Sequence, residues 1–210
     1  RWHAKPSAFI VLPHTPETDW RAIDEEYMAE HYPKTYNYFV RFKQQLLSRS
    51  GYRLLRQGHP FYTIVDIHSH TFAPYKVVWR GEVAPVLTVA VCSPHNGTVI
   101  PDQTCYFTAC NTADEAHFLC SILNSSPVQL YYCMRSYKHA SMKFVSEMSI
   151  PSFSPDEKSH TMLANLSEEA HRAAETGDTK RLAEVEAEID ELAAELWGLT
   201  ATELRDIQTS

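Results

Sequence analysis

The sequence predicts an α+β fold: a mixed, mostly antiparallel sheet with flanking helices, followed by a C-terminal α-helical hairpin. Three observations predict it. Short β-branched and aromatic segments with prolines between them fill the middle of the chain, helix-start signals follow them, and leucines recur at 3–4 spacing near the end. The expected division is a lead-in of unclear role over 1–30, one domain over 31–151, and the hairpin tail over 156–208.

The first fifty residues predict two helices. A short helix is expected over 19–31 with Asp19 as its N-cap, and Pro33 is expected to open a second helix that continues through Ser48. Apolar side chains at 3–4 spacing give the second helix an amphipathic stripe, formed by Phe39, Phe42 and Leu46.

The middle of the chain predicts a sheet and two further helices. The strands are expected at Phe61–Ile67, Tyr75–Arg80, Val86–Cys92, Thr98–Ile100, Cys105–Ala109 and Lys143–Ile150. Thr112 opens a capping box and predicts a helix through Leu123. Ser126 and Pro127 provide an N-cap and a first-turn proline for a helix that ends near Tyr137.

The C-terminal tail predicts a helical hairpin. Asp178 follows Gly177 in a turn and is expected to cap a helix with a seam at spacings of 3 and 4, made of Leu182, Val185, Ile189, Leu192, Leu196 and Leu199. This seam is shorter than three heptads, so it predicts an intramolecular hairpin and a monomer.

Charge is segregated along the chain, although the whole carries −7. Residues 151–210 hold 5 Lys and Arg against 14 Asp and Glu, an acidic surface that would repel a polyanion. Residues 34–81 hold 8 Lys and Arg against Asp66 alone. A basic surplus with interleaved aromatic residues suits nucleic acid, but on composition alone a solvated basic face without a partner stays open.

Composition excludes several classes. No run of about 18 apolar residues is present to span a membrane, and no signal segment opens the chain. Five cysteines at irregular spacing predict reduced thiols and a cytoplasmic location. The chain begins without Met, so we expect it to be part of a longer protein.

The stretch "TIVDIHSHTF" (63–72) places Asp66, His68 and His70 at alternate positions, which on a strand would share one face and suit Zn²⁺. Hydrolases that use such a motif need many further βα units, which the remaining sequence does not supply. No Gly-x-Gly array and no Gly-x-Ser-x-Gly elbow is present either. A catalytic site within these residues is therefore not expected.

Six segments in order carry a resemblance: "YPKTYNYFVRFKQQLLSR" (32–49), "HPFYTIVDI" (59–67), "APYKVVWR" (73–80), "VIPDQTCYF" (99–107), "AHFLCSILNSSPVQLYY" (116–132) and "ELWGLTATEL" (195–204). Together they resemble the C-terminal target-recognition region of adenine-specific DNA methyltransferases of the type IIG and Taq-like restriction–modification kind. The catalytic Asn-Pro-Pro-Tyr/Phe motif and the Gly-rich loop that binds S-adenosylmethionine are absent and are expected upstream of Arg1.

The resemblance implies a DNA-recognition module whose partners are double-stranded DNA and an N-terminal methyltransferase domain of the same chain. No cofactor is expected within these residues, and S-adenosylmethionine is expected in the parent chain. The expected phosphate contacts are Arg41, Lys43, Arg49, Arg53 and Arg56, and the expected base-edge contacts are His68, His70, Lys76, Arg80 and Tyr137. Arg135 and Lys138 add to the expected DNA-binding surface.

Two alternatives remain. The hairpin could dock a nuclease or another subunit, which would make the chain an assembly module of a restriction–modification complex. The histidines of 63–72 could serve a small metallohydrolase.

Overall fold

The structure is a computed structural model that describes residues 1–6, 8–55, 57–82, 84–94, 97–135 and 140–209. The chain forms two compact units, which are described separately: a sheet unit of Arg1–Lys5 with Pro74–Ser210, and a helical unit of Pro6–Ala73. The expected division at residues 30 and 151 is therefore wrong. Residues 31–73 fold with 6–30, and the tail folds with the sheet.

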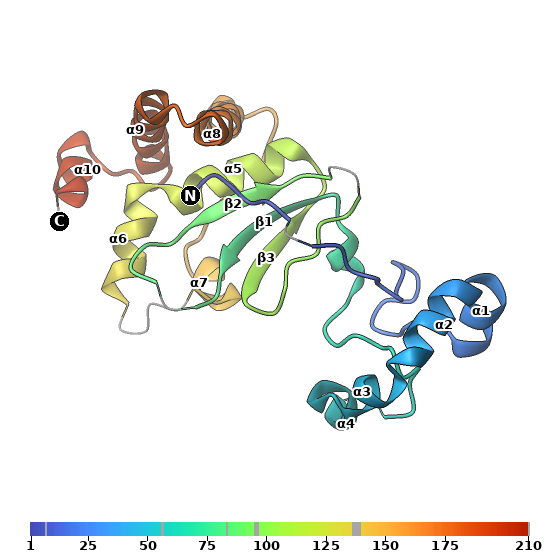
Figure 1. Ribbon diagram of the computed structural model, residues 1–210. Coiled ribbons are helices and arrows are strands. Elements are labelled where there is room, and N and C mark those ends of the chain that lie inside the picture. The colour runs from blue at the N-terminus through green and yellow to red at the C-terminus, as the bar shows by residue number, and fades with distance from the viewer. Residues whose placement is uncertain (7, 56, 83, 95–96, 136–139, 210) are drawn as a thin grey trace. The chain divides into compact units, whose positions relative to one another are not determined.

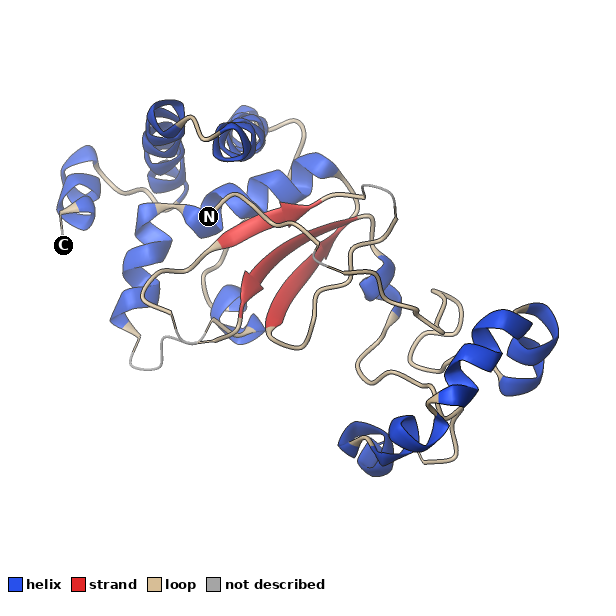
Figure 2. Cartoon of the chain, in the orientation of Figure 1, coloured by secondary structure: helices blue, strands red, loops and turns tan. Residues whose placement is uncertain are grey.

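The sheet unit confirms the α+β expectation. Its strands β1 (Tyr75–Arg80), β2 (Val89–Cys92) and β3 (Cys105–Cys110) are antiparallel in the order β2-β1-β3, with β1 in the centre. Val77 and Trp79 lie on the face that packs into the main core. Figure 2 shows the three strands in red.

Helices cover one face of this sheet. α5 (Ala113–Asn124) contacts all three strands, and α8 (Lys158–Thr176) packs on α5 (Figure 1). α9 (Thr179–Leu196) is antiparallel to α8 and begins at Asp178, which accepts a hydrogen bond from the Arg181 N–H. The predicted hairpin is confirmed. Its buried seam residues Val185 and Ile189 join the core of the sheet unit.

Three shorter helices complete the unit: α6 (Ser126–Met134), α7 (Met142–Ser146) and α10 (Ala201–Gln208). The expected strand Lys143–Ile150 is wrong, because Met142–Ser146 form α7, which buries Phe144, and a turn follows at residues 147–148. Thr98–Ile100 is not a strand either. Within the described residues, no helix combines the length and the apolar composition needed to cross a membrane.

The helical unit contains α1 (Glu25–His31), α2 (Pro33–Arg41), α3 (Lys43–Ser48) and α4 (Ser50–Leu55). The N-cap of α1 is Asp24 and not Asp19, which has a positive φ of 50° in the preceding turn. The expected helix from Pro33 to Ser48 is interrupted at Phe42, the C-cap of α2. The described residues of this unit include no strand, so the expected strand Phe61–Ile67 is wrong.

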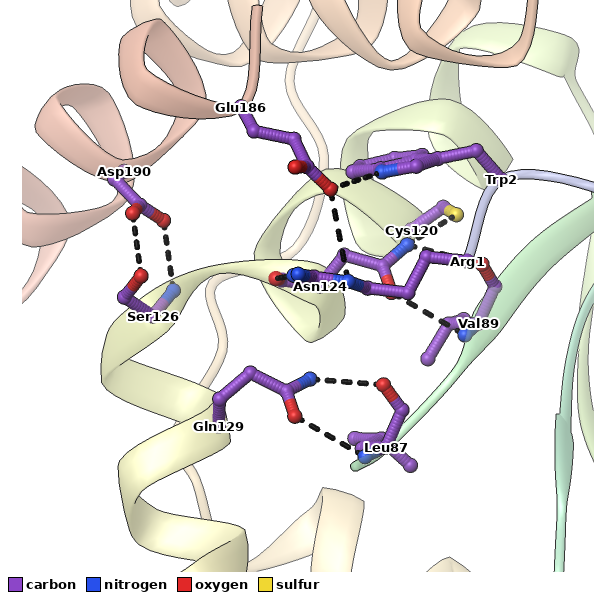
Figure 3. Close-up of polar contacts among 10 residues, drawn as sticks. All are labelled: Arg1, Trp2, Leu87, Val89, Cys120, Asn124, Ser126, Gln129, Glu186 and Asp190. Carbon is purple, nitrogen blue, oxygen red and sulfur yellow. Dashed lines mark hydrogen bonds and ion pairs between the residues drawn. The ribbon is translucent and has the colours of Figure 1, made fainter. Parts of the chain in front are cut away.

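Residues 1–5 are part of the sheet unit and not a lead-in. The Trp2 side chain is buried, and its backbone N–H donates to the Val89 carbonyl at 3.1 Å. Its indole Nε1 donates to Glu186 Oε1 at 2.7 Å, which links the first residues to α9 (Figure 3). The start of the described chain is thus fixed by contacts with residues 87 and 184 positions away.

Two side-chain amides bind the backbone at the start of β2 and just before it. Asn124 donates through Nδ2 to the Val89 carbonyl at 2.9 Å, and its Oδ1 accepts the Val89 N–H at 3.2 Å. Gln129 makes the same pair of bonds with Leu87 at 3.0 and 3.1 Å (Figure 3). These bonds replace the contacts of a neighbouring strand, so these backbone groups of the edge do not remain open to another chain.

Asp190 of α9 binds the first turn of α6. One carboxylate oxygen accepts the Ser126 N–H at 2.7 Å, and the other accepts the Ser126 hydroxyl (Figure 3). The second oxygen also accepts a hydrogen bond from the Gln208 amide at 2.9 Å. The negative charge lies where the helix dipole favours an anion. This buried carboxylate therefore ties α6, α9 and α10 together.

Asp190→Asn is expected to lower the free energy of unfolding by about 1 kcal/mol, because the amide turns one acceptor oxygen into a donor that faces other donors. The isosteric control is Glu191→Gln, at an exposed neighbouring position, with an expected change below about 0.5 kcal/mol. Urea unfolding followed by circular dichroism measures both. Equal values for the two variants would contradict the assigned role of Asp190.

Candidate nucleic-acid interface

The inner face of α2 is fixed by a small aromatic core. Phe39 stacks on Tyr62 with ring centroids 5.0 Å apart, and both pack with Met28 and Phe61. The Tyr62 hydroxyl donates to the Ile23 carbonyl at 2.8 Å, and burial is the main reason that the pKa of Tyr62 is raised. Because this side of α2 is packed, the opposite side must face solvent.

The outer face of α2 carries two cations and an aromatic ring. At 3.6 residues per turn, Lys34, Tyr38 and Arg41 fall within roughly 60° of one another, and Lys34 and Arg41 point away from the side of Phe39. All three are exposed. In the part of the chain that the structure describes, neither Lys34 nor Arg41 forms an ion pair. Both charges are therefore available to an anionic ligand.

The basic character continues through α3 and α4. Residues 33–55 hold five Lys and Arg and no Asp or Glu. Lys43 and Arg53 are exposed, and the Lys43 ammonium lies 4.6 Å from the centre of the Phe61 ring. Arg41, Lys43 and Arg53 are thus exposed, and their expected role as phosphate contacts stays a prediction, while Arg56 lies outside the described residues.

The helical unit is dipolar and not basic overall. Pro6–Ala73 contains seven Lys and Arg and seven Asp and Glu, but six of the acids lie between Glu17 and Glu30, in and before α1. Glu25 of α1 also lies near Tyr36, whose pKa is raised by burial and by this carboxylate. A polyanion would therefore meet this unit through α2 to α4 and avoid α1.

The structure contradicts one of the expected phosphate contacts, Arg49. Its guanidinium is half-buried and donates to three backbone carbonyls, of Leu46 at 3.0 Å, Phe61 at 3.3 Å and Thr63 at 2.9 Å. Burial lowers its pKa. Since its donors are used inside the unit, Arg49 joins the end of α3 to the 61–63 segment and is withdrawn from the interface.

The histidines of 63–72 do not lie on a strand. His68 precedes a 3₁₀ turn, Ser69–Phe72, and Asp66 has a positive φ of 61°. The alternation that would have placed Asp66 with the two imidazoles is therefore lost. The rings of His68 and His70 stack with centroids 5.4 Å apart, and His68 Nδ1 lies 3.8 Å from Asp19 Oδ1.

Both imidazoles remain accessible, so the structure leaves their expected role as DNA contacts untested. For the metallohydrolase alternative, the described residues contain no group of three or more His, Cys, Asp or Glu side chains arranged to hold a metal ion. The five cysteines are all free thiols.

The remaining expected contacts belong to the sheet unit. Lys76 is only 1% exposed, opposite Cys92 in the sheet, and burial lowers its pKa, so its expected base contact is wrong. Arg80 is exposed and pairs with Glu82 at 3.3 Å. Arg135 pairs with Glu147, which raises the pKa of Arg135. Tyr137 and Lys138 lie outside the described residues.

The expected surface is thus divided. The helical unit contains Arg41, Lys43 and Arg53, and the sheet unit contains Arg80 and Arg135. The basic side chains of 34–81 are therefore distributed over two units. Sequence reasoning did not name Lys34 and Tyr38 as candidates for the interface. The spacing of 34, 38 and 41, which places these three residues on one face of a helix, would have identified them.

Comparison with known proteins adds no assignment: no family model matches the chain, and no curated protein matches it.

Proposed function

We propose that the chain binds DNA through the exposed face of α2 and the basic helices that follow it. The observation that carries the proposal is a pair of exposed cations on the outer face of α2, Lys34 and Arg41, which form no ion pair with any residue that the structure describes. Cations held on one rigid face can neutralise several phosphates at once, which supplies most of the affinity of DNA-binding proteins. The acidic surfaces of α1 and α9 orient the molecule by repulsion.

The proposal extends to the biological role. The ordered resemblance of residues 30–208 supports a sequence-recognition module for duplex DNA in an N6-adenine methyltransferase of a restriction–modification system. S-adenosylmethionine and the catalytic residues would then belong to a separate methyltransferase domain of the parent chain. Arg80 and the two histidines of 63–72 are the candidates for base contacts among the described residues.

Lys34→Ala combined with Arg41→Ala is expected to weaken binding to any duplex about tenfold. The slope of log K against log salt should fall by about two, because two phosphate contacts are lost. Fluorescence anisotropy with a labelled duplex at several salt concentrations measures both quantities.

The matched control removes the same charges elsewhere. Lys180→Ala combined with Arg205→Ala, both exposed in the acidic tail, gives the same net charge and is expected to leave affinity and salt slope unchanged. Equal effects of the two double variants would show that only net charge matters. Sequence recognition is tested separately by selection from a random duplex library, in which absence of an enriched word would contradict it.

Protein assembly is a second candidate function, favoured by exposed leucines on α3 and α4. Leu54 is 80% exposed, Leu55 59% and Leu47 37%. A protein partner would bury them, in which case Leu54→Glu would abolish assembly and leave DNA binding unchanged. The hairpin offers less, since α8 and α9 bury their apolar sides within the sheet unit.

A further inference from the structure

The aromatic ring on the outer face of α2 is more exposed than a core residue would be. Tyr38 is 49% exposed, and the neighbouring Phe42 is 41% exposed. Their rings contact each other in a T-shaped arrangement with centroids 5.2 Å apart, and Tyr38 makes a similar contact with Phe39 at 6.1 Å. The Tyr38 ring is therefore held by its neighbours while much of its surface remains open.

Two cations flank this ring along the helix. Lys34 and Arg41 are seven positions apart, which places their backbone atoms roughly 10 Å apart along the axis, with Tyr38 between them. This separation is suited to two phosphates on either side of one or two nucleotides. An exposed ring between two phosphate-binding cations is the arrangement by which proteins hold unpaired bases.

We propose that Tyr38 stacks on an unpaired base while Lys34 and Arg41 bind the phosphates beside it, so that the preferred substrate class is DNA with a locally unpaired segment. The inference rests on the proposed DNA binding and deepens it. In a perfect duplex both faces of each internal base are covered by neighbouring bases, and the ring has no partner there. Only unpaired DNA lets the ring contribute to affinity.

The wild-type chain tests this with three labelled DNA probes of one length: a perfect duplex, the same duplex with four mismatched pairs at its centre, and that bubble with abasic residues at the mismatches. The bubble is expected to bind about tenfold more tightly than the duplex, a typical gain from one stacked base. The abasic bubble keeps its phosphates and should lose this gain. Equal affinity for the two bubbles overturns the inference without any variant.

Variants at Tyr38 locate the effect. Tyr38→Leu should abolish the tighter binding of the bubble relative to the duplex, whereas Tyr38→Phe retains the ring and should retain this preference. Lys34→Ala should weaken binding to all three probes. Circular dichroism confirms that each variant is folded.

The outcomes separate the two proposals. If no probe binds at low salt, the proposed DNA binding fails. If the duplex and both bubbles bind alike, or if Tyr38→Leu weakens all probes equally, DNA binding stands and the stacking role of Tyr38 is wrong.

Discussion

Trp2→Ala is expected to lower the free energy of unfolding of the sheet unit by about 3–5 kcal/mol. The Trp2 side chain is 1% exposed and lies edge-on to His171 with centroids 5.5 Å apart. Alanine would leave a cavity and would remove the indole bond to Glu186. An effect of this size is typical of a large core residue, although Trp2 is the second residue of the sequence.

Hydrogen exchange of the Val89–Cys92 amides, combined with urea unfolding, measures this loss within the sheet unit. The matched control is Phe9→Ala, because Phe9 is an aromatic residue near the same end whose side chain is fully exposed. Its expected change is below about 0.5 kcal/mol. If Trp2→Ala changed stability as little as the control, residues 1–5 would be a lead-in after all.

Lowering the pH from 7 to 5 is expected to destabilise the sheet unit by about 2 kcal/mol through His117 alone. Burial, followed by the charges of His171 and Arg172, lowers the pKa of His117 from 6.5 to about 4. The folded state therefore binds fewer protons than the unfolded state within this interval. The stabilisation is fully present above pH 6.5 and is lost as the pH falls toward 4.

His171 also contributes stability that is lost as the pH falls. Its Nε2 accepts the Val91 N–H at 3.0 Å and its Nδ1 donates to the Ser167 carbonyl at 2.7 Å, so both nitrogens are used in the neutral form. Burial lowers its pKa, and a second proton on Nε2 would break the bond to β2. The carboxylates with lowered pKa, such as Glu169, act below pH 4.5 and outside this interval.

Urea midpoints at pH 7, 6 and 5 measure the effect. His117→Gln removes one titrating group and should flatten the pH dependence, whereas His31→Gln, at an exposed position in the helical unit, should leave it unchanged. A wild-type midpoint that did not fall between pH 7 and pH 5 would contradict the buried neutral state of His117.

The site could be predicted from sequence only in part. The basic surplus of 34–81 includes Arg41, Lys43 and Arg53, which the structure exposes, because charged side chains remain at the surface unless a partner is available. The same reasoning failed for Arg49 and Lys76. Arg49 finds carbonyl acceptors 12 and 14 residues away, and Lys76 is covered on its face of the sheet. A count of charges along the sequence reveals neither the carbonyl acceptors of Arg49 nor the burial of Lys76.

The sequence by itself determined the elements whose signals are local. β1 has the predicted bounds, α5 begins beside the predicted cap Thr112, and the hairpin turns at Asp178. Caps and periodicity act within one or two turns of chain, so they do not depend on the rest of the fold.

Only the tertiary structure decided the remainder. Phe61–Ile67 has the composition of a strand, but no strand among the described residues pairs with it. The segment instead forms turns and contributes Phe61 and Tyr62 to an aromatic core. The division into two units, the burial of Trp2 and the amide bonds of Asn124 and Gln129 along β2 depend on partners 35 to 184 residues away. Such contacts form because folding brings distant segments together, and no local pattern specifies them.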